Sequence, residues 1–274
     1  APTKAPTSPP AGVQGQLAFA VYNAGLRSYT LYTAKVDGSD LHAIADYVYQ
    51  PDFSPNGVRL AVNGYEGGND DLWNIKYDGS DRRKVAGHFS DDAFPTWSPD
   101  GSQVLVSSTR QGDGVSRLYV GKNPISSHLT KFIIGAYSLW LPTGEIAFNG
   151  CDYGWGSDSH CGMWRVSPGG VPKQITDQTG DIPTDATSAD LLFLRAEGAN
   201  WDVYRVPLGG GAPTRLTDSP SRDGPAAYSP DGKTIAFLSD RSGAWALYTM
   251  DRQGGGVKKR LDLPNGGAYD AGPH

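Results

Sequence analysis

The stretch WSPDG, from Trp97 to Gly101, has three near-copies in the chain. FSPNG begins at Phe53, WLPTG at Trp140 and YSPDG at Tyr228. In such a turn proline presets φ, an aspartate or asparagine bonds to the local backbone, and glycine accepts a positive φ. The motif therefore predicts a tight turn between two strands. We expect the aromatic residue ahead of it to wedge between neighbouring sheets.

The turn glycines recur with a fixed period. The four glycines are Gly57, Gly101, Gly144 and Gly232. They are separated by 44, 43 and 88 residues, and the last separation is twice the first. This spacing predicts a degenerate copy near residue 188. The segment 185–194 (DATSADLLFL) fits, because it has lost the aromatic and the glycine but keeps the apolar strand. A period of this length is typical of β-propellers, in which each repeat forms one blade.

A second motif occurs six times and has the period of two expected of a strand. The copies are LYTAK (31–35), LWNIK (72–76), LYVGK (118–122), MWRVS (163–167), VYRVP (203–207) and LYTMD (247–251). A single four-stranded sheet cannot bury both of its faces, whereas sheets stacked radially bury them against each other. The sequence therefore predicts an all-β fold, a six-bladed β-propeller of four-stranded antiparallel blades, over residues 14–274.

Both chain termini are predicted to build one blade. YDAGPH (269–274) aligns with DDAFPT (91–96), the first strand of a unit, and the remaining three strands begin at GQLAFAVYN (15–23). Residues 1–13 are a Pro/Thr-rich spacer, expected to be extended because each proline fixes φ and lacks a donor. Such a spacer tethers an ectodomain to an anchor or a neighbouring domain, or is the trimmed N-terminus of a secreted protein.

Composition narrows the function classes. The 274 residues include 36 glycines and 20 prolines, yet 11% are aromatic, which favours a turn-rich folded domain over disorder. The formal net charge is −5 and the longest basic cluster is 258–260, so nucleic acid is not an expected partner. No run of about 18 apolar residues occurs. We expect a monomeric domain that meets a membrane only through a tether N-terminal to the spacer.

At these motifs the chain resembles the TolB-type propellers, also called WD-like repeat proteins. Their pattern is the aromatic-S-P-D-G turn, an apolar strand such as KTIAFLSDRSG (233–243), and then LYTMD; residues 224–261 match it most closely. The resemblance covers about residues 15–274 and implies the propeller fold, here without the N-terminal domain of TolB. It implies no single function, because the family includes colicin-associated periplasmic proteins, peptidase propellers and sensor ectodomains.

Varied loops on one face of the ring form the expected ligand-binding face. Its candidate residues lie between the second and third strands of the blades: Tyr65, Arg110, Tyr153, Trp155, Arg195 and Arg241. A protein, peptide or saccharide ligand is expected there. The alternative for Arg241 is that it fixes its own loop.

Four aspartates lie in the connections that lead into the blades, each two or three residues before an aligned proline: Asp92, Asp181, Asp223 and Asp270. Equivalent positions in a ring converge, so these carboxylates are expected at the channel mouth. Ca²⁺ or a basic side chain would relieve their repulsion there, and no other cofactor is indicated. The alternative is that each aspartate caps its own turn or pairs with Arg82, Arg222 or a backbone amide.

The two cysteines, Cys151 and Cys161, lie in the longest loop. An antiparallel register that pairs Asn149 with Met163 also pairs the cysteines, which predicts a disulfide and hence an extracytoplasmic location. A zinc site with His160 is the alternative, although one histidine and two cysteines in a single loop have weak metal spacing. The bridge would present the two loop-tip aromatics to a sugar ring or a peptide side chain, unless the loop folds over them.

The sequence carries no G-x-S-x-G, H-E-x-x-H or G-x-x-x-x-G-K-[ST] motif. We therefore expect an extracytoplasmic binding or sensing module of a larger cell-surface or secreted protein. The competing class is a propeller hydrolase or lyase that acts on a saccharide or peptide from the same face. An enzyme is expected to show a deep pocket with convergent histidine, arginine and carboxylate groups, and a binding module a broad rim. A purely architectural domain is a third possibility.

Overall fold

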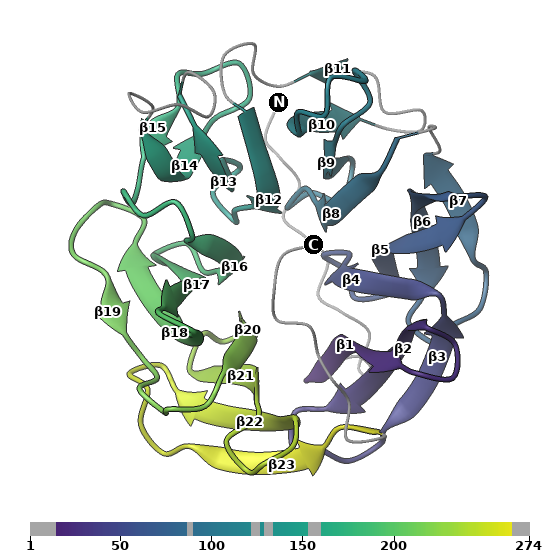
Figure 1. Cartoon of the computed structure of the whole chain (residues 1–274), viewed down its shortest axis with the longest axis vertical. Coiled ribbons are helices and arrows are strands. Elements are labelled where there is room, and N and C mark those ends of the chain that lie inside the picture. Colours follow the sequence, from purple (N-terminus) through teal and green to yellow (C-terminus); the bar gives the residue numbers. More distant parts are fainter. Residues whose placement is uncertain (1–14, 87–89, 122–126, 129–133, 153–159, 265–274) are drawn as a thin grey trace.

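The computed structural model describes residues 15–264, apart from 87–89, 122–126, 129–133 and 153–159. The described residues form 23 strands and no helix, arranged as six antiparallel sheets around one axis (Figure 1). Five sheets have four strands and the first has three. This arrangement confirms the all-β, six-bladed propeller.

The strands of each blade follow chain order from the axis outward. The first blade contains β1 (Gln16–Asn23), β2 (Ser28–Lys35) and β3 (His42–Asp46). The second contains β4 (Val48–Phe53), β5 (Arg59–Glu66), β6 (Asn69–Lys76) and β7 (Arg83–Ala86). The third contains β8 (Asp92–Trp97), β9 (Val104–Ser108), β10 (Arg117–Gly121) and β11 (Ser127–His128).

The last three blades repeat this order. The fourth contains β12 (Ile134–Trp140), β13 (Ile146–Cys151), β14 (Cys161–Val166) and β15 (Lys173–Gln174). The fifth contains β16 (Ile182–Ala186), β17 (Asp190–Glu197), β18 (Asn200–Pro207) and β19 (Thr214–Arg215). The sixth contains β20 (Asp223–Tyr228), β21 (Thr234–Ser239), β22 (Ala246–Asp251) and β23 (Lys258–Asp262).

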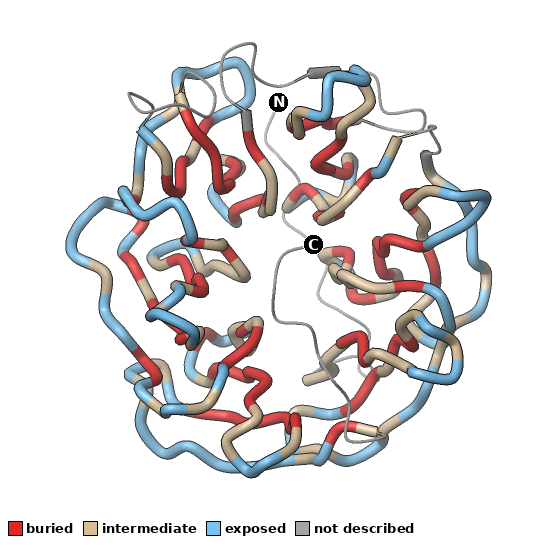
Figure 2. The backbone as a smooth tube through the Cα atoms, viewed as in Figure 1, coloured by how far each residue is buried: buried red, intermediate tan, exposed pale blue. Residues whose placement is uncertain are grey.

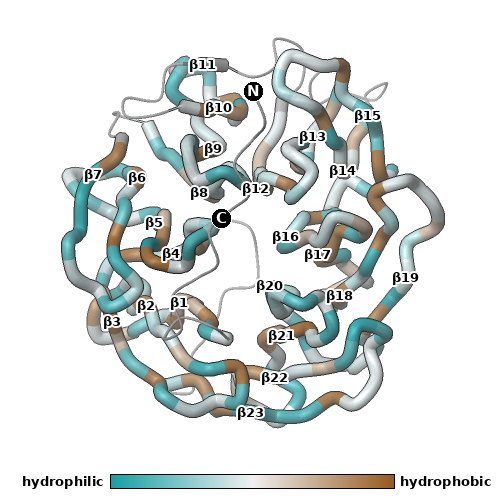
Figure 3. The backbone as a smooth tube through the Cα atoms, turned by 180° about the vertical axis from the view of Figure 1, so that it is seen from behind, coloured by the Kyte–Doolittle hydropathy of each residue, from teal (hydrophilic) through white to brown (hydrophobic). Residues whose placement is uncertain are grey.

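The hydrophobic core lies between the blades rather than within them. The buried apolar side chains form six clusters, and each cluster spans one junction between neighbouring blades. At one junction Leu105 of the third blade packs with Ile146 and Phe148 of the fourth. Buried residues accordingly concentrate in the middle strands of the blades, such as β9 and β13, while the outer connections are exposed (Figure 2). Hydrophobic segments occur all round the ring rather than on one side of it (Figure 3).

The aromatic residues ahead of the S-P-D-G turns are the expected wedges. Trp97 packs against the cluster that joins the second and third blades, and Trp140 belongs to the next cluster. The turn also has its predicted chemistry: Gly101 has φ 68° and donates its N–H to the Ser98 carbonyl, and Ser98 Oγ donates to Asp100 at 2.7 Å.

Turn glycines between the last two described strands of a blade lie against the backbone of the preceding blade. A Cβ on Gly38 would lie 2.3 Å from the carbonyl oxygen of Arg260, and one on Gly79 would lie 2.3 Å from that of Ile44. Both glycines also have positive φ, so no other residue fits without displacing the neighbouring strand. These contacts join the blades at the rim of the ring.

The ring closes between the first and sixth blades. Phe19 of β1 packs with Leu238 of β21 and Leu247 of β22 in one cluster. β1 pairs only with β2 among the described strands, so its inner edge faces the axis. The predicted closing strand at 269–274, with Asp270, lies outside the described residues, as does the spacer 1–13. No helix in the described part of the chain is long and apolar enough to cross a membrane.

Deletion of residues 266–274 tests the predicted closure. If this segment pairs with β1, its loss removes a strand from one blade and exposes the apolar side chains beside it. We expect a loss of a few kcal/mol, which lowers Tm by about 5–10 °C in a domain of this size. Circular dichroism melting measures the shift. Deletion of residues 1–13 is the control and should change Tm by about 2 °C or less; an unchanged Tm after the C-terminal deletion would contradict closure by this segment.

Candidate functional site

The predicted disulfide is present. Asn149 pairs with Met163 across β13 and β14, and the same register places Cys151 opposite Cys161, which are bonded. His160 bonds through Nδ1 to Asp152 at 2.8 Å. Tyr153 and Trp155, predicted at the tip of this loop, lie outside the described residues.

Three predicted channel aspartates form ion pairs inside their own blades. Their partners are arginines predicted for the ligand-binding face: Asp92 pairs with Arg110 at 2.7 Å, Asp181 with Arg195 at 2.6 Å and Asp223 with Arg241 at 2.9 Å. The carboxylates are fully buried, while the arginine side chains are 14%, 19% and 20% exposed. Each arginine neutralises the carboxylate that its own blade buries.

The tyrosines of the second repeated motif (LYVGK, VYRVP and LYTMD) explain the geometry of these pairs. The guanidinium groups lie over the tyrosine rings of that motif: Arg110 over Tyr119 at 4.6 Å, Arg195 over Tyr204 at 5.1 Å and Arg241 over Tyr248 at 5.2 Å. In two blades the arginine Nε also donates to a serine hydroxyl, to Ser108 and to Ser239. Contacts with a ring, a hydroxyl and a carboxylate fix each arginine in place.

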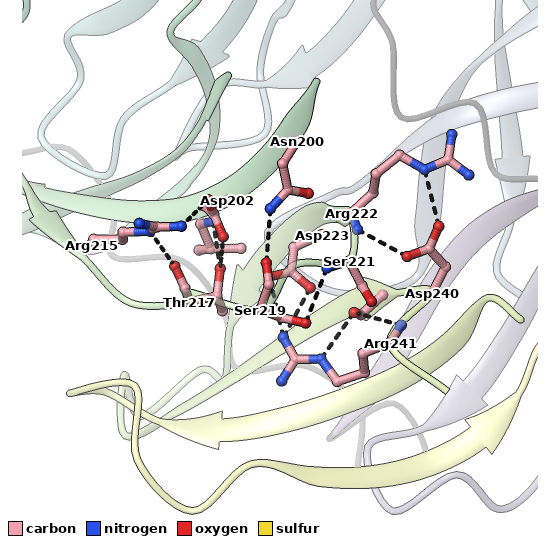
Figure 4. A network of polar contacts seen from close by, with 12 residues as sticks. Asn200, Asp202, Arg215, Thr217, Ser219, Ser221, Arg222, Asp223, Asp240 and Arg241 are labelled. Atoms are coloured by element: carbon pink, nitrogen blue, oxygen red, sulfur yellow. Dashed lines mark hydrogen bonds and ion pairs between the residues drawn. The ribbon is translucent and has the colours of Figure 1, made fainter. Parts of the chain in front are cut away.

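This arrangement corresponds to the alternative in which the aspartates are neutralised locally. The partners are not those suggested from sequence, however, because Arg222 pairs with Asp240 at 3.0 Å (Figure 4). The described residues contain no group of three or more His, Cys, Asp or Glu side chains placed to hold a metal ion. A calcium site at the channel mouth therefore stays a prediction.

A cavity of about 720 Å³ lies on the ring axis of the described structure. All six blades contribute to its lining, from β1, β4, β8, β12, β16 and β20. Its described lining is mostly apolar and aromatic, with Arg27, Asp52 and Asp70 as its charged residues and no histidine. This volume is in the range of small-molecule and peptide side-chain pockets. Of the residues predicted for the ligand-binding face, the described lining includes only Tyr65.

Most of the described non-glycine residues with positive φ lie around this cavity. Seven described residues other than glycine have positive φ, and five of them line it: Arg27, Tyr47, Gln50, Phe94 and Tyr137. A bulky side chain in this region is held against its backbone preference at a cost of about 1–3 kcal/mol. Such strain concentrates at ligand-binding positions because the surrounding fold imposes it.

Three of the strained residues belong to a β-bulge that is repeated in consecutive blades. Gln50, Phe94 and Tyr137 occupy equivalent bulges in β4, β8 and β12 of consecutive blades. Each bulge aims a large side chain at the axis, and the rings of Phe94 and Tyr137 lie 4.4 Å apart. The Phe94 N–H donates to Gln50 Oε1 at 2.8 Å. The sequence-equivalent positions in β16 and β20 are Pro183 and Pro225, so the wall of the cavity is asymmetric.

A row of tyrosines forms the loop-side end of the cavity. Tyr22 and Tyr29 are cross-strand partners with rings 5.6 Å apart, and Tyr49 lies 5.3 Å from Tyr29. Tyr47 and Tyr65 are 43% and 55% exposed, the largest exposures of aromatic side chains in the described residues. We call these five residues the tyrosine row. Sequence analysis found only Tyr65 among them, although the dense Y-x-Y pattern at 47–49 was a visible signal.

Two more aspartates that the sequence did not point to, Asp52 and Asp185, lie on opposite blades of the ring. The Asp52 carboxylate accepts the Trp97 N–H at 2.7 Å, and the Asp185 carboxylate accepts the Tyr228 N–H at 2.6 Å, so each joins its blade to the next. Burial raises the pKa of Asp52 to about 7, and the Asp185 charge adds to this effect. Burial also raises the pKa of Asp185 to about 6.

Arg241→Ala is expected to lower the free energy of unfolding by about 3–5 kcal/mol, because it leaves the Asp223 carboxylate buried without its cation. Adding Asp223→Asn should recover part of this loss. Urea unfolding measures both effects. Lys233→Ala is the control: its pair with Asp231 has side chains 82% and 57% exposed, and the change should be about 0.5 kcal/mol or less. Equal effects of the two alanine variants would contradict the assigned role of the buried pair.

Asp52→Asn is expected to flatten the pH dependence of stability. The folded protein holds the pKa of Asp52 above its unfolded value, so folding favours the protonated form. Stability is then highest below the unfolded pKa and is lost as pH rises towards 7 and above. Asparagine still accepts the Trp97 N–H but carries no charge. Wild-type Tm should therefore fall more than that of the variant between pH 5 and pH 8; parallel Tm curves would disprove this assignment.

No family model matches the chain. Among curated proteins, the uncharacterized protein Atu1656 of Agrobacterium fabrum is 27% identical over 184 residues, which are 63% of this chain and 59% of that protein. A segment of 65 residues is 42% identical to the uncharacterized peptidase YuxL of Bacillus subtilis, and it covers 23% of this chain and 10% of that protein. The chain thus spans less than two thirds of the length of these relatives.

Solved structures match over most of the chain. TolB from Acinetobacter baumannii has a TM-score of 0.72 and 19% identity, over 91% of this chain and 66% of that one. A putative TolB from Agrobacterium tumefaciens has a TM-score of 0.67 and 20% identity, over 90% and 89%. The propeller domain of the trilobed protease from Pyrococcus furiosus follows with 0.57 and 13%, over 89% and 79%. At these identities the likeness concerns the fold, and it confirms that this chain folds as a TolB-like β-propeller.

Proposed function

We propose that this propeller is a binding module that takes a peptide segment of a partner protein into its axial cavity from the loop side. The observation that carries the proposal is the coincidence of three features in one place. The cavity is large enough for peptide side chains, its wall is aromatic, and five of the seven described non-glycine residues with positive φ line it. A purely architectural ring has no need for strained aromatic residues on its axis.

The chemistry of the wall favours binding over catalysis. Aromatic side chains bury much area at little entropic cost and are enriched where partners are anchored. A deep pocket with convergent histidine, arginine and carboxylate groups was expected of an enzyme. The axial cavity contains Arg27, Asp52 and Asp70, but its described lining contains no histidine. The TolB-type propellers that the repeats resemble include colicin-associated proteins, which supports a protein partner, and the solved TolB structures share the fold.

We also propose that the domain works outside the cytoplasm. The bonded pair Cys151–Cys161 supports this location, because disulfides persist in oxidising compartments. The TolB-type propellers that the repeats resemble include periplasmic proteins, which supports it further. Thiol labelling in intact cells tests the location: modification of both cysteines without prior reduction would contradict it.

Selection of short random peptides displayed on phage tests the binding function. Enriched peptides, made synthetically, should bind the wild-type protein in calorimetry. Phe94→Ala and Tyr137→Ala should each weaken that binding about tenfold or more, because each removes a ring from the cavity wall. Tyr77→Ala is the matched control, since Tyr77 follows β6 and does not line the cavity. Failure of any peptide to enrich, or equal binding by all variants, would refute the proposal.

A further inference from the structure

An unneutralised carboxylate borders the tyrosine row. Asp70 lies at the start of β6, directly opposite Tyr65 in the β5–β6 ladder, and it lines the axial cavity. Its Oδ1 is buried and has no hydrogen-bond partner among the described residues. The described ion pairs include none to Asp70. It differs in this respect from the buried Asp92, Asp181 and Asp223, each of which has an arginine.

The surroundings of Asp70 add negative charge. Its N–H donates to the Asp91 carboxylate at 3.1 Å, which places a second acidic side chain beside it. Lys84 is engaged elsewhere, because it pairs with Asp71 at 2.5 Å and with Glu66 at 3.4 Å. Burial raises the pKa of Asp70, and repulsion by Asp91 and Asp71 adds to this effect, whereas the Tyr49 hydroxyl bond opposes it. A cation placed here would remove this repulsion.

The tyrosine row supplies what a cation needs besides a counter-charge. Tyr49 is hydrogen-bonded to Asp70, which joins the row to the carboxylate. Tyr47 and Tyr65 lie at the same ladder level, since the Tyr65 N–H donates to the Tyr47 carbonyl at 3.3 Å, and both rings are exposed. Aromatic faces attract ammonium and guanidinium groups, and the attraction grows when water is excluded.

We propose that Asp70 and the tyrosine row form a pocket for a cationic side chain, a lysine or an arginine, of the bound peptide. This inference rests on the proposed peptide-binding function and names the chemistry of its anchoring residue. The aliphatic stem of the side chain lies along the rings, while its charge meets the Asp70 carboxylate. Charge complementarity supports this occupant, because the chain carries a net charge of −5 and the described ion pairs leave this particular carboxylate without a cation.

Two small probes test the pocket without any selected peptide. Nα-acetyl-lysine methylamide carries the cation, and Nα-acetyl-norleucine methylamide has a similar stem without it. Ligand-observed NMR titration of the wild-type protein should show about tenfold tighter binding of the lysine probe, with Kd in the millimolar range. Asp70→Asn should abolish this preference by weakening only the lysine probe. Tyr65→Ala should weaken both probes, because it removes a wall of the pocket.

Asp177→Asn is the matched control. It removes the same charge from an exposed site outside the cavity lining, so the lysine preference should persist. Thermal melting shows that each variant is folded; Asp70→Asn keeps an oxygen that can accept the Tyr49 hydroxyl. Equal binding of the two probes, binding of neither, or a preference that survives Asp70→Asn would overturn the inference. If selected peptides bind but the lysine preference is absent, this inference fails while the proposed function stands.

Discussion

The structure depends on burial of apolar surface between blades. Among the described residues no blade has a core of its own, since each of the six hydrophobic clusters takes side chains from two neighbouring sheets. A blade is therefore stable only with a neighbour on both sides, and this requires a closed ring. Phe19 and Leu247 show the requirement most directly, because they join the first and last blades into one cluster. The repeated aromatic-S-P-D-G turn contributes to this burial, because its aromatic residue packs in the junction between blades while the turn ends the strand.

Much of the architecture could be predicted from the sequence, because a motif that recurs at a fixed spacing marks the equivalent place in each blade. The spacing of Gly57, Gly101, Gly144 and Gly232 predicted the blades, and strand register alone predicted that Cys151 faces Cys161. Repetition works less well for the candidate site, where the copies differ. Asp92, Asp181 and Asp223 were expected in the connections that enter the blades, and they lie at or just before the start of β8, β16 and β20. Their arginine partners lie in or just after the next strand of the same blade, a pairing that a linear alignment does not show.

The cavity was missed for a related physical reason. Gln50, Phe94 and Tyr137 read as ordinary strand residues, and only a bulge with positive φ turns them towards the axis. A non-glycine residue in such a bulge carries no sequence signal of its positive φ, because the surrounding fold imposes this conformation. The same holds for Asp52, whose raised pKa arises from burial and from Asp185, about 130 residues away in the chain. The sequence repeats thus predict the scaffold, whereas the axial cavity is formed by residues that differ from blade to blade.

The rim glycines have a consequence for how a ligand reaches that site. Gly38 and Gly79 hold the backbone of adjacent blades in direct contact at the perimeter, while Asp52 and Asp185 hold them together near the axis. Contacts at the perimeter thus fix the first blade against both of its neighbours, and contacts near the axis join the second blade to the third and the fifth to the sixth, which opposes hinging at these junctions. A guest has to thread in end-on, parallel to the symmetry axis, and a flexible tail is better suited to this route than a bulky folded domain.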